Sequence, residues 1–405
     1  MSMTEIKVYN AIAEEGLKIL EDKGFKLLDV NNPEAIILRS ENLNDMEIHK
    51  NLVGVSRAGA GVNNIPVDRL TENGVVVFNT PGANANAVSE LVLASMIVAV
   101  RQMIPANIWA EALSGENISK QVEKGKKQFK GTEIKGKTLG VIGLGSIGHL
   151  VANAAIDLGM TVIGYDPYLK KDPADKLHRY VQRVDDLNEI YENADFITVH
   201  VPAIESNHHL IDEKALEQMN ADTILLNFSR DLLVDSEAVV KALDANQLQM
   251  YMTDFPTKEL IGREDCLVFP HLGASTVEAE KICAIMAANQ LSDFIQTGNI
   301  KNAVNFPNVE MDIETETRIA IVNRNVPNML SLLVDEIGQH DINIVHFMNK
   351  SKGAYAYTLI ELDETDPDLL NELVNNIRNA ENILSARLIK IIDKKEFSNG
   401  RYTTF

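Results

Sequence analysis

The sequence predicts an α/β protein with two doubly wound parallel sheets, followed by a C-terminal ferredoxin-like βαββαβ domain. Short apolar runs alternate with amphipathic helical patterns over roughly the first 300 residues, which is typical of βαβ units. A second βα series begins at Lys137, and an acidic connector, VEMDIETET, follows Phe306-Pro307. Because 405 residues exceed what one core usually accommodates, we expect separate domains.

Each element follows from its periodicity. The N-terminal strands are expected at residues 5–9, 35–38, 52–57 and 75–78, before a helix from Ala87 to Arg101. Strands of the second series are expected at 138–142, 161–165, 196–199, 223–227, 250–253 and 266–269, before a helix over 276–297. In the tail, the βαββαβ order is expected over 318–323, 327–339, 342–349, 354–362, 366–379 and 383–391.

These elements predict three domains. The two βα series are expected to form two α/β domains, and the βαββαβ tail a third domain of a kind that can bind a small ligand. The lysine-rich stretch KQVEKGKKQFKG, between the two βα series, is interpreted as a solvated linker.

Composition limits the possible partners. A net charge of −20 argues against nucleic acid and anionic membranes, which would be repelled. The two cysteines, Cys266 and Cys283, lack metal-ligand spacing, so we expect no metal site and a reducing compartment. The start of the chain has no basic segment followed by an apolar core, and we expect a cytoplasmic protein.

The segment GLGSIG predicts a dinucleotide site, because it follows an apolar strand, opens a helix and precedes a second strand ending in Asp166. Its helix start favours phosphate, while Asp166 can accept hydrogen bonds from a ribose diol. We therefore expect NAD rather than NADP, although Lys170 and Lys171 leave NADP open. The alternative is an ordinary βα turn with a surface aspartate. The expected cofactor residues are Gly143, Gly145, Ser146, Ile147 and Asp166.

Oxidation of a 2-hydroxy acid needs a cation for the carboxylate and a base for the hydroxyl proton, both at strand ends. Arg230 follows one predicted strand and His271 another, and together they suit these roles. Glu259 is the candidate carboxylate partner of the histidine, and Asp254 is expected on the nicotinamide side. Each residue alone could be an ordinary surface side chain.

Two N-terminal strand ends are expected to complete the pocket. Arg39 could bind a phosphate, with Ser40 adding a hydroxyl, though a plain surface charge is the default. The glycine-rich turn after Arg57 could present backbone amides to an anion, or be a turn without a ligand. Its candidate residues are Gly59, Gly61 and Val62.

These blocks, with NTPGANANAVSELV, HVP, NFSRDLLVD and PHLGAST, resemble the D-isomer-specific 2-hydroxyacid dehydrogenase family over roughly the first 305 positions. The resemblance implies that Arg230 holds the substrate, that His271 is the acid/base and that Glu259 is its partner. It also implies cofactor contacts at His200 and Pro202, and self-association of the chain into a dimer or tetramer. The resemblance further implies a discontinuous, flavodoxin-like substrate domain of residues 1–98 and 284–306, a Rossmann NAD domain of residues 99–283 and a regulatory domain of residues 316–395.

Further features resemble the phosphoglycerate dehydrogenases of that family: LRS at Leu38 to Ser40, and a tail similar to an ACT domain. The resemblance implies a phosphorylated hydroxy acid as substrate, and serine as a possible effector at Asn325 and Asn343. Departures are Asp231 beside the substrate arginine, Glu41, Asn328 in the effector loop, and the form of DFPTKEL. Lys126 or Lys127 of a neighbouring subunit could substitute for the cation missing at Glu41.

The leading hypothesis is hydride transfer between NAD and 3-phosphoglycerate. One alternative is the same chemistry on another 2-hydroxy acid, such as lactate or glycerate. The second is a protein that senses NAD without catalysis.

Overall fold

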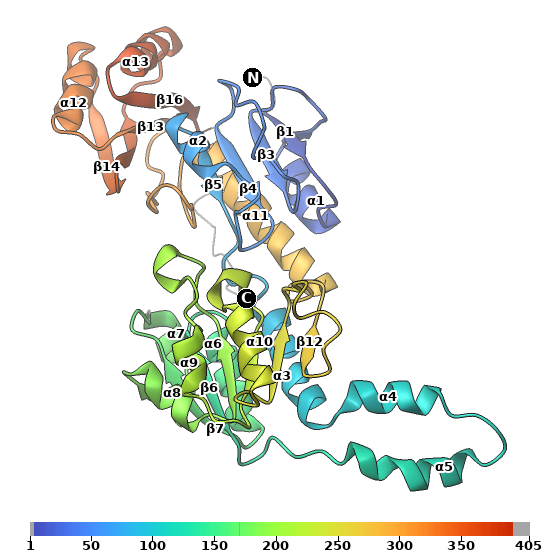
Figure 1. Ribbon diagram of the computed structural model, residues 1–405. Coiled ribbons are helices and arrows are strands. Elements are labelled where there is room, and N and C mark those ends of the chain that lie inside the picture. Colours follow the sequence, from blue (N-terminus) through green and yellow to red (C-terminus); the bar gives the residue numbers. More distant parts are fainter. Residues whose placement is uncertain (1–3, 170, 392–405) are drawn as a thin grey trace. The chain divides into compact units, whose positions relative to one another are not determined.

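The computed structural model describes residues 4–169 and 171–391, and the chain divides into two compact units. One contains residues 1–83 with 280–405, and the other contains residues 84–279 (Figure 1). Among the described residues, no single helix is long and apolar enough to cross a membrane. Only α3 (Ala85–Val100) and α4 (Met103–Glu111) together meet that test, as a pair bent by 65°.

The first unit begins with a five-stranded parallel sheet in the order β2-β1-β3-β4-β5, which is the flavodoxin-like arrangement. The strands are β1 (Glu5–Val8), β2 (Lys26–Leu27), β3 (Ala35–Leu38), β4 (Gly54–Arg57) and β5 (Val76–Phe78). The helices of this part are α1 (Glu14–Asp22), α2 (Val67–Glu72) and α11 (Val277–Thr297). The sequence did not predict β2, because two residues are too few to carry an alternating pattern.

The second unit holds a seven-stranded parallel sheet in the order β12-β11-β10-β9-β6-β7-β8, which is the Rossmann order with one added strand. Its strands are β6 (Thr138–Ile142), β7 (Thr161–Tyr165), β8 (Gln182–Val184), β9 (Phe196–Val199), β10 (Ile224–Asn227), β11 (Met250–Thr253) and β12 (Cys266–Val268). The predicted strands agree with these to within one residue. The sequence missed β8, whose residues QRV contain a single apolar side chain.

Helices cover both faces of this sheet. They are α6 (Gly148–Asp157), α7 (Lys171–Lys176), α8 (Leu187–Asn193), α9 (Glu213–Glu217) and α10 (Ser236–Asp244), with 3-10 turns η2 (Glu205–Asn207) and η3 (Asp231–Leu233). One face of α3 is also buried here, because Val92 and Met96 share a core with Leu139 and Val141 of β6.

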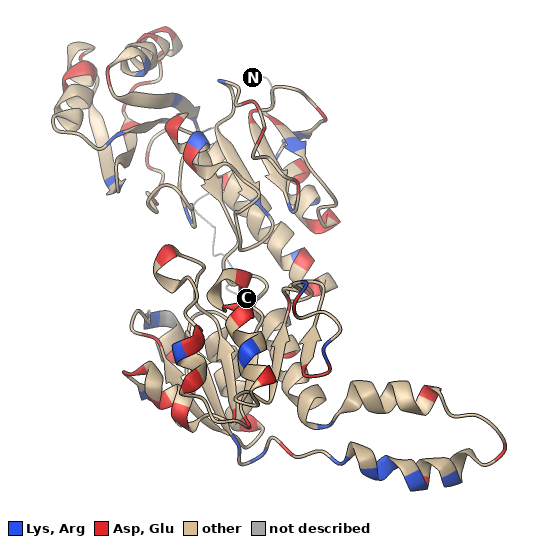
Figure 2. Ribbon diagram, viewed as in Figure 1, with Lys and Arg blue, Asp and Glu red and all other residues tan. Residues whose placement is uncertain are grey.

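The lysines of the lysine-rich stretch are exposed to solvent, as predicted, but the stretch is helical. After α4 the chain turns back through α5 (Ile118–Gly125) and η1 (Lys126–Phe129), and this helical arm (residues 103–129) projects from the second unit (Figure 1). Trp109 of α4 packs against Phe129 with ring centroids 5.4 Å apart. The lysines lie on α5 and η1 (Figure 2). Because they face water, they gave the stretch the composition of a loop.

The C-terminal part of the first unit is a four-stranded antiparallel sheet in the order β14-β15-β13-β16, with the predicted βαββαβ connectivity. Its strands are β13 (Thr317–Arg324), β14 (Ile344–Lys352), β15 (Tyr355–Leu362) and β16 (Ile383–Lys390), and its helices are α12 (Met329–Gln339) and α13 (Pro367–Asn379). Leu333 and Ile337 of α12 and Leu370 and Leu373 of α13 pack on the sheet in one core.

A buried ion pair joins this sheet to the end of α11. Arg318 of β13 and Glu361 of β15 are both fully buried, with Nε and Oε1 2.8 Å apart. The remaining guanidinium N–H groups donate to the carbonyls of Thr297 (3.0 Å), Met311 (2.8 Å) and Asp312. Since the last carbonyls of a helix have no partner within it, Arg318 satisfies one of them and fixes the connector to the sheet.

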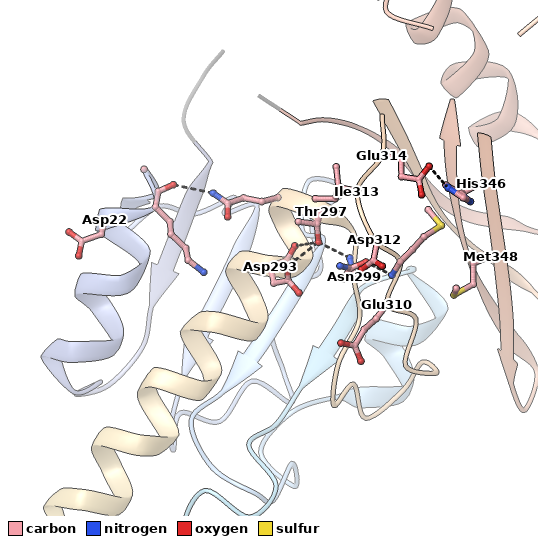
Figure 3. Close-up of a pocket in the computed structure, with 14 residues that line it drawn as sticks. Asp22, Asp293, Thr297, Asn299, Glu310, Asp312, Ile313, Glu314, His346 and Met348 are labelled. Carbon is pink, nitrogen blue, oxygen red and sulfur yellow. Dashed lines mark hydrogen bonds and ion pairs between the residues drawn. The ribbon is translucent and has the colours of Figure 1, made fainter. Parts of the chain in front are cut away.

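Beside this junction lies a cavity of about 860 Å³. Figure 3 shows the carboxylates of Asp293, Glu310 and Asp312 near the end of α11, and a contact of 3.0 Å between Glu314 and His346. Among the described residues, no group of three His, Cys, Asp or Glu side chains is arranged to hold a metal ion.

Candidate active site

The predicted site residues of the second unit follow neighbouring strands of one sheet. Gly143 follows β6, His200 follows β9, Arg230 comes soon after β10, Asp254 follows β11, and His271 comes soon after β12. All these strands are parallel and hydrogen-bonded in sequence across the sheet. Parallel strands end at one edge, where open α/β sheets bind ligands. The structure thus brings the glycine turn, the arginine and the histidine to the same edge.

The glycine turn has the geometry of a phosphate cradle. Gly143 has φ of +94°, and a Cβ on Gly148 would lie 1.8 Å from the carbonyl oxygen of Gly143. Around Gly145, in contrast, a Cβ would meet no atom within 4 Å. Gly143 and Gly148 therefore shape the turn, whereas Gly145 leaves open space near the start of α6. The exposed Ser146 and then Ile147 directly precede that helix. Open space beside free amides fits a dinucleotide pyrophosphate.

Asp166, at the end of β7, lies next to this turn. Its carboxylate accepts hydrogen bonds from the backbone N–H groups of Leu144 (2.9 Å) and Tyr168 (2.9 Å). These two bonds fix the carboxylate relative to the glycine turn. Each carboxylate oxygen can accept more than one bond, so Asp166 retains capacity for a ribose hydroxyl.

His200 is half-buried directly after β9, and Pro202 is exposed. The Nε2 atom of His200 lies 2.9 Å from the hydroxyl of Thr198, and burial lowers the pKa of the imidazole to about 3. Its Nδ1 atom has no hydrogen-bond partner among the described residues. His200 is therefore a neutral buried side chain with one polar atom to satisfy.

Arg230 is half-buried and held by its own loop. One guanidinium N–H donates to the carbonyl of Ser229 at 2.6 Å, and the side-chain amide of Asn227 donates to the carbonyl of Arg230 at 2.8 Å. Burial lowers the pKa of Arg230, while the charge of Asp231 raises it. An arginine stays protonated despite such a shift, so a cation is available at this edge for a carboxylate.

His271 projects from a left-handed turn, with φ of +56°, and its side chain is exposed. Its ring packs edge-on against Phe255, with centroids 5.1 Å apart. Glu259 is exposed, and a hydrogen bond from its own backbone N–H is the largest cause lowering its pKa. Among the described residues, no hydrogen bond or ion pair joins Glu259 to His271.

Asp254 directly follows β11 at the same edge of the sheet. It is 1% exposed, and its carboxylate oxygens accept the N–H groups of Leu272 (3.0 Å) and Gly273 (2.7 Å). The carboxylate therefore faces the loop that carries His271.

In the first unit, the candidate loops follow adjacent strands, β3 and β4. Arg39 forms an ion pair with Glu280 of α11, with Nη1 and Oε1 2.7 Å apart and each side chain at least one third exposed. Ser40 is held through its N–H, which donates to Asn10 at 3.0 Å. A phosphate at this loop would compete with Glu280 for the guanidinium of Arg39.

Two residues that build these loops were not predicted. Arg57 donates to the carbonyls of Arg39 (2.9 Å) and Gly61, which ties the two loops together. Asn64 donates to the carbonyl of Glu41 at 2.6 Å. The sequence indicated a role for both residues only through their position in RAGAGVNN, at the end of a predicted strand and in the turn that follows it. Gly59 and Val62 lie in the same turn, whose shape the Arg57 side chain helps to fix.

The two candidate effector residues lie on the C-terminal domain. Asn325 donates from its side chain to the carbonyl of Gly353 at 3.2 Å, and Asn343 is exposed before β14. Asn328 precedes α12 with φ of +69°, a conformation that glycine adopts readily. The loop thus keeps the backbone shape suited to a glycine although it carries asparagine.

Comparison with known proteins agrees with this architecture. Residues 93–273 match the family model described as D-isomer specific 2-hydroxyacid dehydrogenase, NAD binding domain. D-3-phosphoglycerate dehydrogenase of Methanocaldococcus jannaschii is 34% identical over 76% of this chain and 61% of its own length. Hydroxypyruvate reductase of Thermotoga maritima is 36% identical over 58% of this chain and 75% of its own length. This chain spans about three fifths of the first phosphoglycerate dehydrogenases that it matches.

Solved structures show the same fold. The NAD+-bound 3-phosphoglycerate dehydrogenase of Entamoeba histolytica superposes with a TM-score of 0.59 at 25% identity, covering 75% of this chain and 99% of that one. The holo D-mandelate dehydrogenase of Rhodotorula graminis gives a TM-score of 0.65 at 24% identity, covering 75% and 98%. The chain belongs to the D-isomer-specific 2-hydroxyacid dehydrogenase family.

Proposed function

We propose that this chain is a cytoplasmic NAD-dependent dehydrogenase that oxidises 3-phospho-D-glycerate to 3-phosphohydroxypyruvate, the first step of L-serine biosynthesis. The observation that carries the proposal is the single sheet edge shared by the glycine turn, Arg230 and His271. In this proposal residues 1–98 with 284–306 bind the substrate and residues 99–283 bind NAD, while residues 316–395 regulate.

Each step has a residue suited to it. Arg230 holds the substrate carboxylate and polarises the oxygen on the reacting carbon. His271 accepts the hydroxyl proton, and NAD, when bound, supplies the hydride acceptor. Gly145, Ser146 and Ile147 leave the amides at the start of α6 open for the pyrophosphate, and Asp166 accepts a ribose hydroxyl. A carboxylate at Asp166 would repel a 2′-phosphate, which favours NAD over NADP.

The decisive assay is oxidation of NADH by the purified chain in the presence of 3-phosphohydroxypyruvate. We expect turnover in the wild type and a loss of about 10²–10⁴-fold in His271→Ala, with NADH binding retained. His49→Ala, a histidine of the first unit outside the candidate site, is the control. Binding of NADH without any turnover would instead support a protein that senses NAD without catalysis.

A second substrate class has its own support. The relative from Thermotoga maritima is named a hydroxypyruvate reductase, and Arg39 is already paired with Glu280. If Arg39 binds the substrate phosphate, Arg39→Ala should raise KM for 3-phosphohydroxypyruvate by about 10–100-fold and leave KM for hydroxypyruvate unchanged. Glu280→Gln should lower the first KM, because it releases the guanidinium. Equal losses on both substrates would exclude a phosphate role for Arg39. Arg183→Ala, which removes an exposed arginine elsewhere, is the control and should change neither KM.

The helical arm supports self-association into a dimer or tetramer. Met103, Ile104, Ile108 and Ile118 on this arm are all more than one third exposed, which is unusual for several large apolar side chains on one small element. Ile108→Lys should lower the mass measured by light scattering, whereas Ile261→Lys, equally exposed elsewhere, should not. In an assembly, Lys126 or Lys127 of this arm could serve a neighbouring subunit.

Serine is the proposed effector of the C-terminal domain. The exposed Asn325 and Asn343 and the positive φ of Asn328 support this assignment. Titration calorimetry should detect L-serine binding to the wild type, and Asn325→Ala and Asn343→Ala should weaken it. No heat with the wild-type chain would refute the assignment.

A further inference from the structure

The loop that carries His271 is fixed by three successive backbone N–H groups that converge on one residue. The N–H of His271 is shared between the carbonyls of Phe269 (3.0 Å) and Asp254 (3.2 Å), and those of Leu272 and Gly273 donate to the two carboxylate oxygens of Asp254. Successive amides around a left-handed residue form a concavity that binds an anion. Here the anion is a side chain of the protein itself.

Asp254 is in turn rigidly placed. It directly follows β11, which lies between β10 and β12 in the sheet, and its N–H donates to the carbonyl of Asn227 at 3.2 Å. Its side chain is almost fully buried, so no water competes strongly for the carboxylate. A Cβ on Gly273 would lie 3.1 Å from Oδ2, so a side chain at this position would crowd the carboxylate.

The neighbouring residue holds the ring. Phe255 packs against the imidazole of His271 in an edge-on contact, with an interplanar angle of 75°. The pair Asp254–Phe255 thus constrains both the backbone and the side chain of His271. A non-glycine residue rarely holds φ near +56° unless its surroundings impose it.

We infer that Asp254 is a positioning residue for His271, and that its carboxylate orients the imidazole by acting through the loop amides. The inference rests on the proposed function, in which His271 moves the hydroxyl proton. The carboxylate fixes the turn from which the imidazole projects, and the turn sets where the proton acceptor lies.

The kinetic test is a double-mutant cycle. The side chain of Asp254→Asn has one oxygen and one NH2 group, so only one of the two N–H groups of Leu272 and Gly273 can still donate to it. The other N–H faces the NH2 group, and the turn is released. We expect kcat to fall about 10–100-fold in Asp254→Asn, and less than about 3-fold when the same change is made in His271→Ala. Equal losses in the two backgrounds would overturn the inference.

A second measurement does not depend on turnover. In ¹³C-histidine-labelled protein, the resonance assigned through His271→Ala should move in Asp254→Asn, because the ring leaves Phe255, while the other eight histidines keep their shifts. Asp222→Asn, an exposed carboxylate before β10, should move none of them. An unmoved His271 resonance would refute the positioning role even if the chain had no dehydrogenase activity. Unchanged shifts of the other histidines also establish that the variant folds.

Phe255→Leu supplies a milder variant. It keeps an apolar side chain and the loop hydrogen bonds but removes the ring contact. We expect the His271 resonance to move and kcat to fall less than in Asp254→Asn. A larger loss in Phe255→Leu would place the orienting role in the ring contact and overturn the assignment to the carboxylate.

Discussion

The ion pair between Arg318 and Glu361 should control the stability of the first unit. In Arg318→Met a side chain of similar volume replaces the guanidinium. Glu361 then keeps its buried charge, and among the described residues only the N–H of Glu314 donates to its side chain (3.1 Å). The carbonyls of Thr297 and Met311 also lose their donor. Breaking a buried pair from one side costs about 3–5 kcal/mol, so we expect a loss in this range. With an m-value of about 2–3 kcal/mol/M, the urea midpoint should fall by about 1–2.5 M.

Far-UV circular dichroism measures this transition, and Trp109 provides an internal reference because it lies in the second unit. The double variant Arg318→Met/Glu361→Met should lose less than Arg318→Met alone, since no unpaired charge remains buried. A midpoint for Arg318→Met within 0.3 M of the wild type, or strict additivity in the double variant, would refute the reasoning. The first result would mean that water reaches the carboxylate. The second would mean that the two charges do not interact.

Further predictions concern glycines and one buried acid. Gly145→Ala should fold with an unchanged Tm yet lose most NADH affinity, measured by fluorescence, because its Cβ enters open space where the pyrophosphate approaches. Gly148→Ala should lower the Tm, since its Cβ would lie 1.8 Å from a backbone oxygen. Gly125→Ala should displace the indole of Trp109, 2.2 Å from the new Cβ, and shift its emission to the red; unchanged emission would contradict the packing of the arm. Burial raises the pKa of Asp293, so its charged form destabilises the folded state at neutral pH. Asp293→Asn should therefore raise the urea midpoint at pH 7, and the gain should shrink as the pH falls towards 3.8; a constant gain would exclude titration of this group.

The local pattern of the sequence determined most of the fold. Apolar runs of four or five residues between turn signals located the central strands, because such runs are buried on both faces of a parallel sheet. The βαββαβ order of the tail was equally clear. The failures were β2 and β8, which are short, and the helical arm, whose water-facing lysines gave it the composition of a linker.

The sequence also predicted which residues gather at the sheet edge. Arg230 and His271 follow strands, and parallel strands end on the same side, so their shared edge depends only on topology. Which groups pair with them depended on contacts that no local pattern encodes. Arg39 meets Glu280, 241 residues away in the sequence, and the carboxylate beside the His271 loop is Asp254 rather than Glu259. Strand position follows from hydrophobic periodicity, whereas partners a few ångströms apart are chosen by the direction of individual side chains, which only the tertiary packing fixes.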